Sequence, residues 1–520
     1  MKGNIFILLF SIINNIFCLK LKCGNDKLKF KPPINIKNNN KSSKRNLNTE
    51  FKPMKIKVDY TQLKIDTLEN EEIFEIIKTS LELAIHYFEL LLNVRKDGLS
   101  PSVLKGDYED YCNLDNYDKD FPNWLNDYDL ILFPSLDLKS NSDNVYAAAH
   151  HCYLYKDRPI MGRIYIENNF NYKKENIIIF IQTILFHEIT HILVFDPNLL
   201  HSFNSIEYEI INNEEKSYIK SPKVLEKARI HFGCNTLKGV YLEDQGDSGS
   251  AGTHWEGRYM LGDYMVSINY EENTISDITL ALFEDSGWYK PNYYTGGLFR
   301  FGKDKGCEFF EKKCLVNEKS SFSEFCHKGK KPKCLNSHLG GGECYVGEIK
   351  HEEIPKKYQY FKKSNLGGLY NVNFCPVADS YFESVTQGKF YFETNCRYGA
   401  SSLPHYGEVI GNRSICFESS LLPRSSPQPY KMRSICHKMI CDRLHKHVIV
   451  FINDLNVTCP FKGGTLKKIK GFKGKINCPA YNMVCTSEIW CNEMFDCIDK
   501  KSVTDYSTYN YNPLEQNDEL

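Results

Sequence analysis

The chain has 520 residues, more than one hydrophobic core usually supports, so we expect two to four domains. Its 65 basic and 65 acidic side chains give a formal net charge of zero. This balance gives no support for nucleic acid or an anionic membrane as the main partner. The hydrophobic content of 42% is ordinary for a folded soluble protein.

The first residues have the pattern of a secretory signal peptide. Lys2 precedes an apolar stretch at 5–17, and polar sequence follows it. A stretch this short, after a positive start, is typical of a signal peptide rather than a membrane span, so residues 1–18 are predicted to be one. No later stretch reaches the roughly 18 consecutive apolar residues of a span, so no transmembrane segment is expected beyond it.

A basic, polar segment follows. Residues 31–58 are rich in Lys, Asn and Pro and contain little to bury, so we expect a flexible segment there. Residues 19–58 are therefore assigned to a propeptide and flexible segment, with Lys44-Arg45 as a candidate processing site.

Regular elements are predicted after this segment. From Glu69 to Val94, apolar residues recur at helical spacing, which predicts a long amphipathic helix. The stretches Tyr128–Pro134 and Ile160–Glu167 are short and rich in branched or aromatic residues, so both are predicted strands. Further along, Ile278–Phe283 predicts a short helix that ends near Gly287.

The sequence His-Glu-Ile-Thr-His lies near the end of an apolar run that predicts a buried helix at about 174–194. An α-helix places residues four apart on one face, so His187 and His191 can bind one metal ion together. Glu188 lies one step round the helix, where its carboxylate can reach a water on that metal. The pentapeptide therefore predicts a zinc site.

A catalytic zinc ion has three protein ligands and an open position for water, so a third ligand is needed. One possibility is a glutamate on a following helix, and the candidates are Glu207, Glu209, Glu214 and Glu215. The other is a histidine, and the candidates are His201, His231 and His254. Zinc chemistry alone leaves this choice open.

Cysteines are concentrated in the C-terminal part. The chain has 20 cysteines, which in a secreted protein indicate disulfides. Without Cys18 in the signal peptide and Cys23, the remainder suffices for nine pairs. No Cys-x-x-Cys pair occurs, which counts against structural zinc. We propose Cys112–Cys152 as one disulfide from position alone.

Two sequons lie in this cysteine-rich part, at Asn412 and Asn456. Both are predicted glycosylation sites, which agrees with passage through the secretory pathway. The four residues 517–520, Asn-Asp-Glu-Leu, resemble an ER-retention signal. We therefore predict secretion, with retention in the ER lumen as the alternative.

The sequence after the pentapeptide resembles the leishmanolysin branch of the metzincin zinc peptidases. The matching stretches are His231–Cys234, Leu242–Gly246, Gly249–His254, Gly262–Met265, Leu282–Tyr289 and Gly306-Cys307. Upstream, residues 159–167 resemble the strand that precedes the active-site helix of the family. The similarity is good from about residue 125 to 315 and weaker beyond.

This resemblance implies the rest of the site. His254 corresponds to the third zinc-binding histidine, and Met265 to the methionine of a tight turn beneath the metal. It also implies a Cys234–Cys307 disulfide. Cys23 matches the cysteine of the family's propeptide switch, whose thiolate blocks the open position of zinc. The two histidines that flank this cysteine in the family pattern are missing here.

The implied fold is α+β, with three units after the propeptide. Residues 59–197 are expected to form a metzincin-type catalytic domain of a twisted sheet plus the active-site helix. Residues 198–303 are expected to form a central mixed domain that supplies the third ligand and the methionine turn. Residues 304–520 are expected to form a disulfide-rich, mainly β domain.

The implied function is that of a secreted endopeptidase, made as a zymogen and expected to be a monomer, which binds one Zn²⁺ per chain and cleaves proteins and peptides. Glu188 would act as general base. Val194 departs from the family pattern HExxHxxG, in which glycine allows a sharp turn, because valine resists positive φ. Either the helix continues before turning or the site is displaced. The alternative function is that of a catalytically degenerate homologue whose Cys-rich part binds a partner or a surface glycan.

Overall fold

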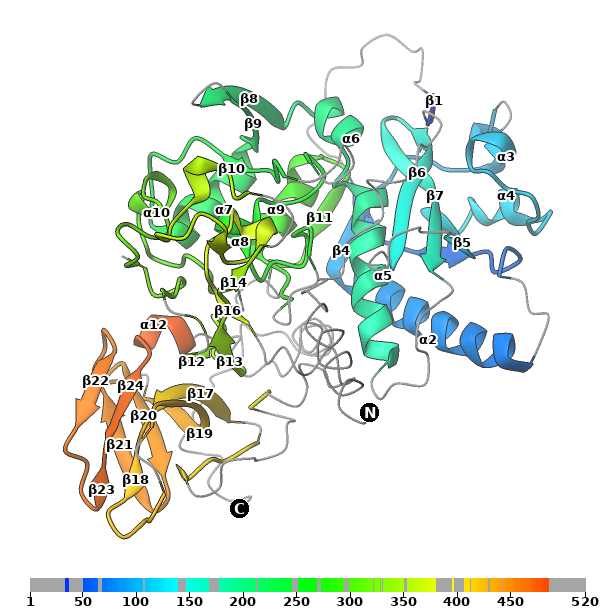
Figure 1. Ribbon diagram of the computed structural model, residues 1–520. Helices are drawn as coiled ribbons and strands as arrows, with labels where there is room; N and C mark the ends of the chain where they lie inside the picture. Colours follow the sequence, from blue (N-terminus) through cyan, green and yellow to red (C-terminus); the bar gives the residue numbers. More distant parts are fainter. Residues whose placement is uncertain are drawn as a thin grey trace, which may run out of the picture.

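The fold is drawn in Figure 1 from a computed structural model. The structure describes residues 33–36, 50–63, 68–105, 108–138, 146–167, 177–211, 214–245, 251–268, 273–293, 299–320, 322–327, 329, 331–349, 353–379, 395–396, 406–411, 413–428, 431–442 and 444–485. Cys23, Asn412, the predicted signal peptide and residues 517–520 lie outside them.

A five-stranded sheet forms the frame of the N-terminal part. In spatial order its strands are β1 (Ile34–Ile36), β6 (Ala147–Tyr155), β7 (Arg158–Glu167), β5 (Leu130–Leu138) and β3 (Ile56–Val58). β3, β5 and β7 are parallel, whereas β6 is antiparallel to β7. Lys156 and Asp157 join β6 to β7, and both have positive φ, as a type I′ hairpin turn requires. The smaller elements of this part are η2 (Pro101–Val103), α3 (Tyr108–Tyr111) and α4 (Phe121–Trp124).

Two long helices, α2 (Leu68–Leu91) and α5 (Ile177–Leu193), pack side by side, and α5 also packs on β6 and β7 (Figure 1). Phe88 of α2 stacks on Phe186 of α5, with ring centroids 4.0 Å apart. A Cβ atom at Gly162 of β7 would lie 2.6 Å from Cγ2 of Ile192, so glycine is what allows α5 to approach the sheet this closely.

The N-terminal strands correct the expectation of a flexible segment at 31–58. β1, β3 and β2 (Phe51–Pro53) all belong to sheets, and Met54, Ile56 and Val58 are buried in the main core. A segment with few apolar residues can therefore still form edge strands, because alternate residues of a strand suffice to cover the core.

The other predicted elements are largely confirmed. The two strands correspond to β5 and β7, and the helix with the His-Glu pentapeptide corresponds to α5. The long amphipathic helix is confirmed as α2 but ends at Leu91, because Leu92–Arg95 forms strand β4 and pairs with β2. The predicted helix before Gly287 is α9 (Asp277–Asp285), and Gly287 has a φ of 71°.

The central part contains short elements. After α5 come α6 (Pro197–Ser202), β8 (Ile206–Ile211), β9 (Glu214–Ile219), α7 (Pro222–Phe232), β10 (Val240–Tyr241), α8 (Gly257–Met260), α9 and β11 (Tyr289–Pro291). β8, β9 and β10 form an antiparallel sheet with β9 in the middle. β11 pairs with β4, so the central part is joined to the N-terminal part by a sheet.

The C-terminal part is mainly β, and residues 415–484 have a core of their own, whereas buried residues between Phe309 and Val377 belong to the main core. Its six-stranded sheet has the order β21 (Leu455–Cys459), β20 (His447–Ile452), β19 (Arg433–Asp442), β17 (Ser414–Ser419), β24 (Lys475–Cys478), β22 (Gly464–Lys467). The remaining elements are α10 (Glu308–Glu311), β12 (Pro332–Cys334), β13 (Gly341–Cys344), β14 (Gly347–Glu348), η4 (Lys356–Tyr358), β15 (Leu366–Gly367), η5 (Tyr370–Val372), β16 (Ala378–Asp379), β18 (Leu422–Pro423), β23 (Phe472–Lys473) and α12 (Tyr481–Val484). The predicted α+β fold with a disulfide-rich, mainly β C-terminal part is confirmed.

Eight disulfides link the described residues. Both proposed pairs are present, Cys112–Cys152 and Cys234–Cys307. The others are Cys314–Cys375, Cys326–Cys344, Cys334–Cys416, Cys396–Cys436, Cys441–Cys485 and Cys459–Cys478. Disulfides at this density indicate an oxidising compartment, such as the secretory pathway or the cell exterior.

Among the described residues, one helical stretch, 177–202, is long and apolar enough to cross a membrane by length and composition. Most of it is buried inside the protein, where α5 packs between α2 and the sheet. Its apolar character is explained by this position in the core, because a helix surrounded by protein is hydrophobic on every side.

Candidate metal centre

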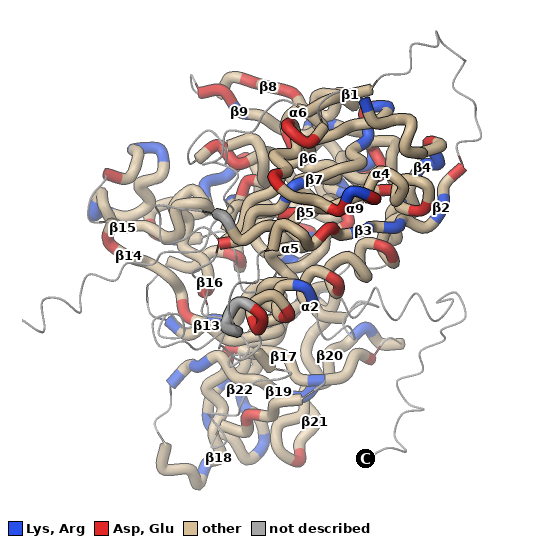
Figure 2. The backbone as a smooth tube through the Cα atoms, turned by 90° about the vertical axis from the view of Figure 1, so that its right-hand side faces the viewer, with Lys and Arg blue, Asp and Glu red and all other residues tan. Residues whose placement is uncertain are grey.

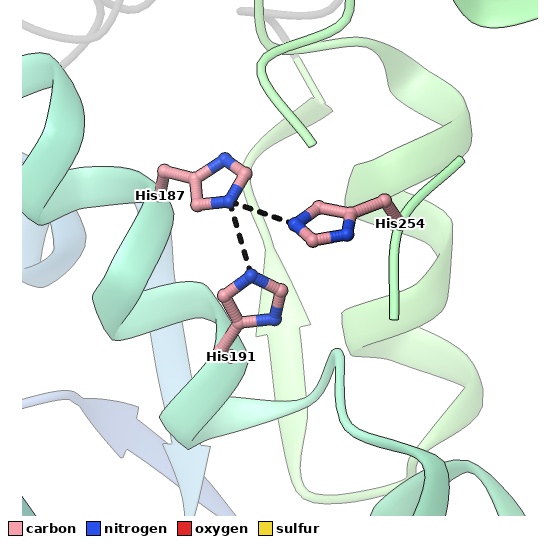
Figure 3. A group of neighbouring side chains, drawn as sticks. All are labelled: His187, His191 and His254. Carbon is pink, nitrogen blue, oxygen red and sulfur yellow. Dashed lines mark hydrogen bonds between the residues drawn. The ribbon is translucent and has the colours of Figure 1, made fainter. Parts of the chain in front are cut away.

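Three histidine side chains converge between α5 and the segment that precedes α8 (Figure 3). The Nε2 atoms of His187 and His191 are 3.0 Å apart, and the Nε2 atoms of His187 and His254 are 3.2 Å apart. All three residues are at least nine-tenths buried. The structure thus brings together the two helix histidines and the distant histidine that the family resemblance selected.

The outer nitrogen of each ring is held by another group. Nδ1 of His187 lies 2.6 Å from the carbonyl oxygen of Tyr264, and Nδ1 of His191 lies 2.8 Å from that of Phe195. Nδ1 of His254 lies 2.9 Å from the hydroxyl of Thr253. A carbonyl oxygen can only accept, so His187 and His191 must carry their protons on Nδ1.

The Nε2 atoms of these two neutral rings therefore present lone pairs to each other at close range, which is unfavourable unless a cation lies between them. Burial lowers the pKa of His187 to about 4 and that of His191 well below its usual value, so both rings are neutral near pH 7. Neutral imidazoles whose other nitrogen is hydrogen-bonded are the ligands that zinc prefers. The donor set fits one zinc ion.

The end of α5 explains how valine replaces the glycine of the family pattern. The N–H of Val194 still donates to Thr190 O at 3.0 Å, and the N–H of Phe195 donates to the same oxygen at 3.0 Å. Val194 does not have positive φ. Helical hydrogen bonding thus continues through Val194, and a wider turn then directs the Phe195 carbonyl back to His191. α5 itself ends at Leu193, so Val194 lies in the turn that follows the helix and adopts it without positive φ.

Asp196 ends this turn and starts α6. Its Oδ1 accepts a hydrogen bond from the N–H of Asn198 at 2.8 Å, and Pro197 occupies the first helical position. An aspartate cap followed by proline is a strong helix start, so the chain direction after His191 is set locally.

The segment that precedes α8 positions His254. Its carbonyl accepts from the N–H of Glu243 at 2.9 Å, and the N–H of the next residue, Trp255, donates to Met265 O at 3.0 Å. Met265 is fully buried, in a tight turn that begins at Gly262, whose φ is 96°. The same turn presents the Tyr264 carbonyl to His187, so it contacts both α5 and the segment that carries His254.

Buried polar groups anchor that turn. The N–H of Met265 donates to Oδ1 of Asp263 at 2.8 Å, and the hydroxyl of Thr279 on α9 donates to Oδ2 at 2.8 Å. The indole N–H of Trp255 donates to the same Thr279 oxygen at 2.7 Å. Burial raises the pKa of the Asp263 carboxyl to about 6. No sequence pattern predicts this network, and the only sequence signal is the position of Asp263 two residues before Met265.

The rival third ligands lie elsewhere. His201 bonds the hydroxyl of Tyr208 at 3.1 Å, and Nε2 of His231 lies 2.8 Å from the Phe301 carbonyl. The four candidate glutamates, Glu207, Glu209, Glu214 and Glu215, belong to the β8–β9 hairpin and not to the histidine group. Among the described residues, the group that contains both helix histidines is completed by His254.

Glu188 and Asn456 are the remaining predicted site residues that the structure describes. Glu188 is buried next to His187 on α5. Asn456 is exposed on β21, where a sugar chain has room.

An HExxH helix joined by a third histidine, within an α+β frame, is the arrangement found in the class of metal-dependent peptidases. The particular family follows from sequence comparison. The leishmanolysin family model matches residues 46–491, so the chain belongs to the leishmanolysin family of metallopeptidases.

Relatives from distant organisms agree with this assignment. The chain is 28% identical over 423 residues to a leishmanolysin homolog of Crithidia fasciculata, an alignment that covers 76% of this chain and 62% of the relative. It is 31% identical over 313 residues to a leishmanolysin-like peptidase of Drosophila pseudoobscura pseudoobscura, covering 53% of this chain and 45% of the relative. It is 26% identical over 368 residues to leishmanolysin of Leishmania chagasi, covering 67% and 59%. The chain thus spans less than two thirds of the length of these relatives.

Proposed function

We propose that the protein is a secreted zinc endopeptidase that hydrolyses peptide bonds in proteins. His187, His191 and His254 hold one zinc ion per chain, and Glu188 is the general base. The observation that carries this proposal is the set of inward-facing Nε2 atoms whose rings are fixed from outside by the carbonyls of Tyr264 and Phe195.

Zinc, when bound, acts as a Lewis acid that acidifies a water molecule and polarises the peptide carbonyl. The Glu188 carboxylate takes the proton from the attacking water and passes it to the leaving amine. The hydrogen bonds at Nδ1 keep the three rings in one orientation, and the two carbonyl acceptors also fix the tautomers of His187 and His191. Met265 forms the floor of the site.

We propose that the protein is made as a zymogen, with Cys23 as the switch residue. The positions of the N-terminal strands limit where a propeptide could be cleaved off. Removal of all residues up to 58 would take away β3, which pairs with β5 in the main sheet. Cleavage at Lys44-Arg45 would keep β2 and β3, and the family match starts at residue 46, directly after this pair. Cleavage at the dibasic pair would still release β1, the edge strand that pairs with β6 in the same sheet.

The test uses the processed, purified protein and its Glu188→Gln variant. We expect one zinc ion per chain in both by elemental analysis, cleavage of an unfolded protein by the wild type, and loss of cleavage in the variant. Full cleavage by Glu188→Gln would refute the mechanism. Zinc retention in a His254→Ala variant would refute the ligand set. Stoichiometric zinc without cleavage of any unfolded protein by the wild type would favour the degenerate homologue.

A further inference from the structure

Strand β8 exposes an unusual number of apolar side chains. Tyr208, Ile210 and Ile211 are 46%, 78% and 37% exposed. They are three of the nine exposed large hydrophobic residues in the described part of the chain, and all three lie in one six-residue strand. A cluster of exposed apolar residues marks a contact surface more often than isolated ones do.

β8 is also the edge of its sheet. The order is β10-β9-β8, so one side of β8 pairs with β9, and no described strand pairs with its other side. Its register with β9 runs without a bulge from Ile206 to Ile211, and the strand contains neither proline nor lysine. Natural edge strands usually carry such devices to prevent pairing with another chain, and β8 carries only the charges of Glu207 and Glu209, so its edge is open to a strand that these glutamates do not repel.

The two faces of β8 differ. Tyr208 and Ile210 lie on one face, because residues two apart in a strand share a face. The Tyr208 ring stacks on His201 of α6, with centroids 6.1 Å apart. On the opposite face, Glu207 bonds Lys220, and Glu209 accepts from the Tyr241 hydroxyl at 2.6 Å. The face with Tyr208 and Ile210 is therefore the one turned toward α6, whereas Ile211 lies on the same face as the two glutamates.

The sheet that contains β8 is connected to both segments that carry the site histidines, α5 and the segment with His254. On one side, α6 starts at the turn after His191, and the N–H of Ser205, just before β8, donates to Leu200 O in α6 at 3.0 Å. On the other side, β10 leads directly to Glu243, whose N–H donates to His254 O. Figures 1 and 2 both show the β8–β9 hairpin at the periphery of the protein.

We propose that the β8 edge is a docking strand for protein substrates, which an extended segment of the substrate joins as a further strand. This proposal rests on the proposed peptidase function and specifies its substrate class as unfolded or extended chains. Backbone hydrogen bonds hold the segment, and its apolar side chains pack on Tyr208 and Ile210.

The charge of the hairpin indicates which kind of segment binds to β8. β8 and β9 together carry four glutamates and one lysine, which are Glu207, Glu209, Glu214, Glu215 and Lys216. Figure 2 shows these acidic positions along the hairpin. Lys220 pairs with Glu207, and Lys216 and Lys357 pair with Glu214, so the negative charge that attracts a basic extended segment lies mainly on Glu209 and Glu215. A second copy of β8 would instead place glutamates beside glutamates, which opposes pairing between two copies of this chain.

The experiment compares a short peptide, too small to reach beyond the histidine site, with a reduced and alkylated basic protein. In the processed enzyme, Ile210→Lys is expected to raise KM for the unfolded protein about five- to tenfold while kcat changes little. The kcat/KM for the short peptide stays the same. Ile210→Ser is expected to act in the same direction. Ile230→Lys is the matched control, since Ile230 is 69% exposed on α7, away from β8, and it should alter neither substrate.

Binding separates this proposal from the peptidase function. A labelled unfolded protein is titrated by fluorescence anisotropy into Glu188→Gln and into Glu188→Gln/Ile210→Lys, and the second variant should bind about five- to tenfold more weakly. If the wild type cleaves no protein, the proposed peptidase function is refuted. The docking proposal is still tested in that case, because the titration measures binding without cleavage. Equal binding by both variants would overturn docking. An equal loss of kcat/KM on the short peptide and on the unfolded protein would also overturn docking. Sedimentation that shows Ile210→Lys splitting a dimer would overturn it too, because the β8 edge would then join two copies of this chain.

Discussion

The Thr279 hydroxyl donates to the Asp263 carboxylate at 2.8 Å and simultaneously accepts from the Trp255 indole at 2.7 Å. Trp255 follows His254, and Asp263 holds the turn whose next residue, Tyr264, presents its carbonyl to His187. One side chain on α9 therefore connects the segments that orient two of the three histidines. None of these residues touches the metal position, so they act by positioning.

The first prediction concerns Thr279→Val, which keeps the shape of the side chain and removes the hydroxyl. Three buried polar groups, on Trp255, Asp263 and Ser276, lose a partner, so we expect a loss of about 2–3 kcal/mol in the free energy of unfolding. We also expect zinc to transfer to a chelator about tenfold faster or more, because groups that orient ligands contribute to metal affinity. Urea unfolding and a chelator competition assay measure the two effects.

Thr183→Val is the matched control. Among the described residues, the Thr183 hydroxyl bonds Ile179 O within α5, at 3.0 Å, and the residue is not fully buried. It should leave chelator transfer unchanged. Equal transfer rates for Thr279→Val and Thr183→Val would show that α9 plays no part in orienting the histidines.

The second prediction concerns pH. Burial raises the pKa of Asp263 from 3.8 to about 6, so the folded protein binds more protons than the unfolded chain between these two values. Stability therefore falls as pH rises through this interval, by on the order of 3 kcal/mol for this group. Asp263→Asn cannot ionise and removes this contribution. Urea unfolding at pH 4 and pH 7 should show a smaller fall for the variant, and the same fall in both proteins would contradict the role of Asp263.

Sequence spacing predicted the site residues that lie close together in the chain. His187, Glu188 and His191 are set by helical spacing within five residues, and α5 confirms the helix that carries them. His254 lies 63 positions after His191, so no spacing rule reaches it, and only resemblance to a family selected it over His201 and His231. The carbonyl partners are still less accessible to sequence analysis, because every residue has a carbonyl and tertiary structure decides where each one points.

The missed strands have a similar cause. β3 has only three residues, and its alternation of Ile56, Lys57 and Val58 is too short to distinguish from chance in a Lys-rich segment. β8 mixes glutamates with exposed apolar residues, so its pattern does not show the buried face that identifies most strands. Its exposed face is what makes it a candidate docking surface.

The third prediction addresses Val194→Gly, which restores the glycine of the family pattern. Val194 is fully buried and has no positive φ to relieve, so glycine gains nothing and loses apolar contact and backbone restriction. We expect a loss of about 2–4 kcal/mol in stability with unchanged zinc stoichiometry. Thermal unfolding and elemental analysis measure this. Higher zinc content or faster cleavage in the variant would show that Val194 distorts the site.

The fourth prediction concerns removal of the metal. Without a cation the Nε2 lone pairs of His187 and His191 face each other at 3.0 Å, so a chelator should lower the melting temperature. Zinc should restore it in a concentration-dependent manner, because a ligand that binds only the folded state stabilises it by mass action. Magnesium should not, since it prefers oxygen ligands. A chelator that leaves the melting temperature of wild type and His254→Ala equally unaffected would contradict a metal at this site.

The fifth prediction tests how α5 is seated on the sheet. A Cβ at position 162 would lie within 3.0 Å of three atoms of the Ile192 side chain, next to His191. Gly162→Ala should therefore displace α5 or force Ile192 out of its rotamer, at about 1–3 kcal/mol in stability. Because His191 moves with the helix, chelator-induced zinc loss should also accelerate.

Ile192→Ala provides the compensating change. Alone it leaves a cavity and costs about 2–5 kcal/mol, but in Gly162→Ala/Ile192→Ala the new methyl group occupies part of the vacated space. The double variant should lose less stability than the two single losses added together, with a coupling energy of about 1–3 kcal/mol. Additive losses in this cycle would mean that Gly162 and Ile192 do not meet, and that the approach of α5 to β7 has another cause.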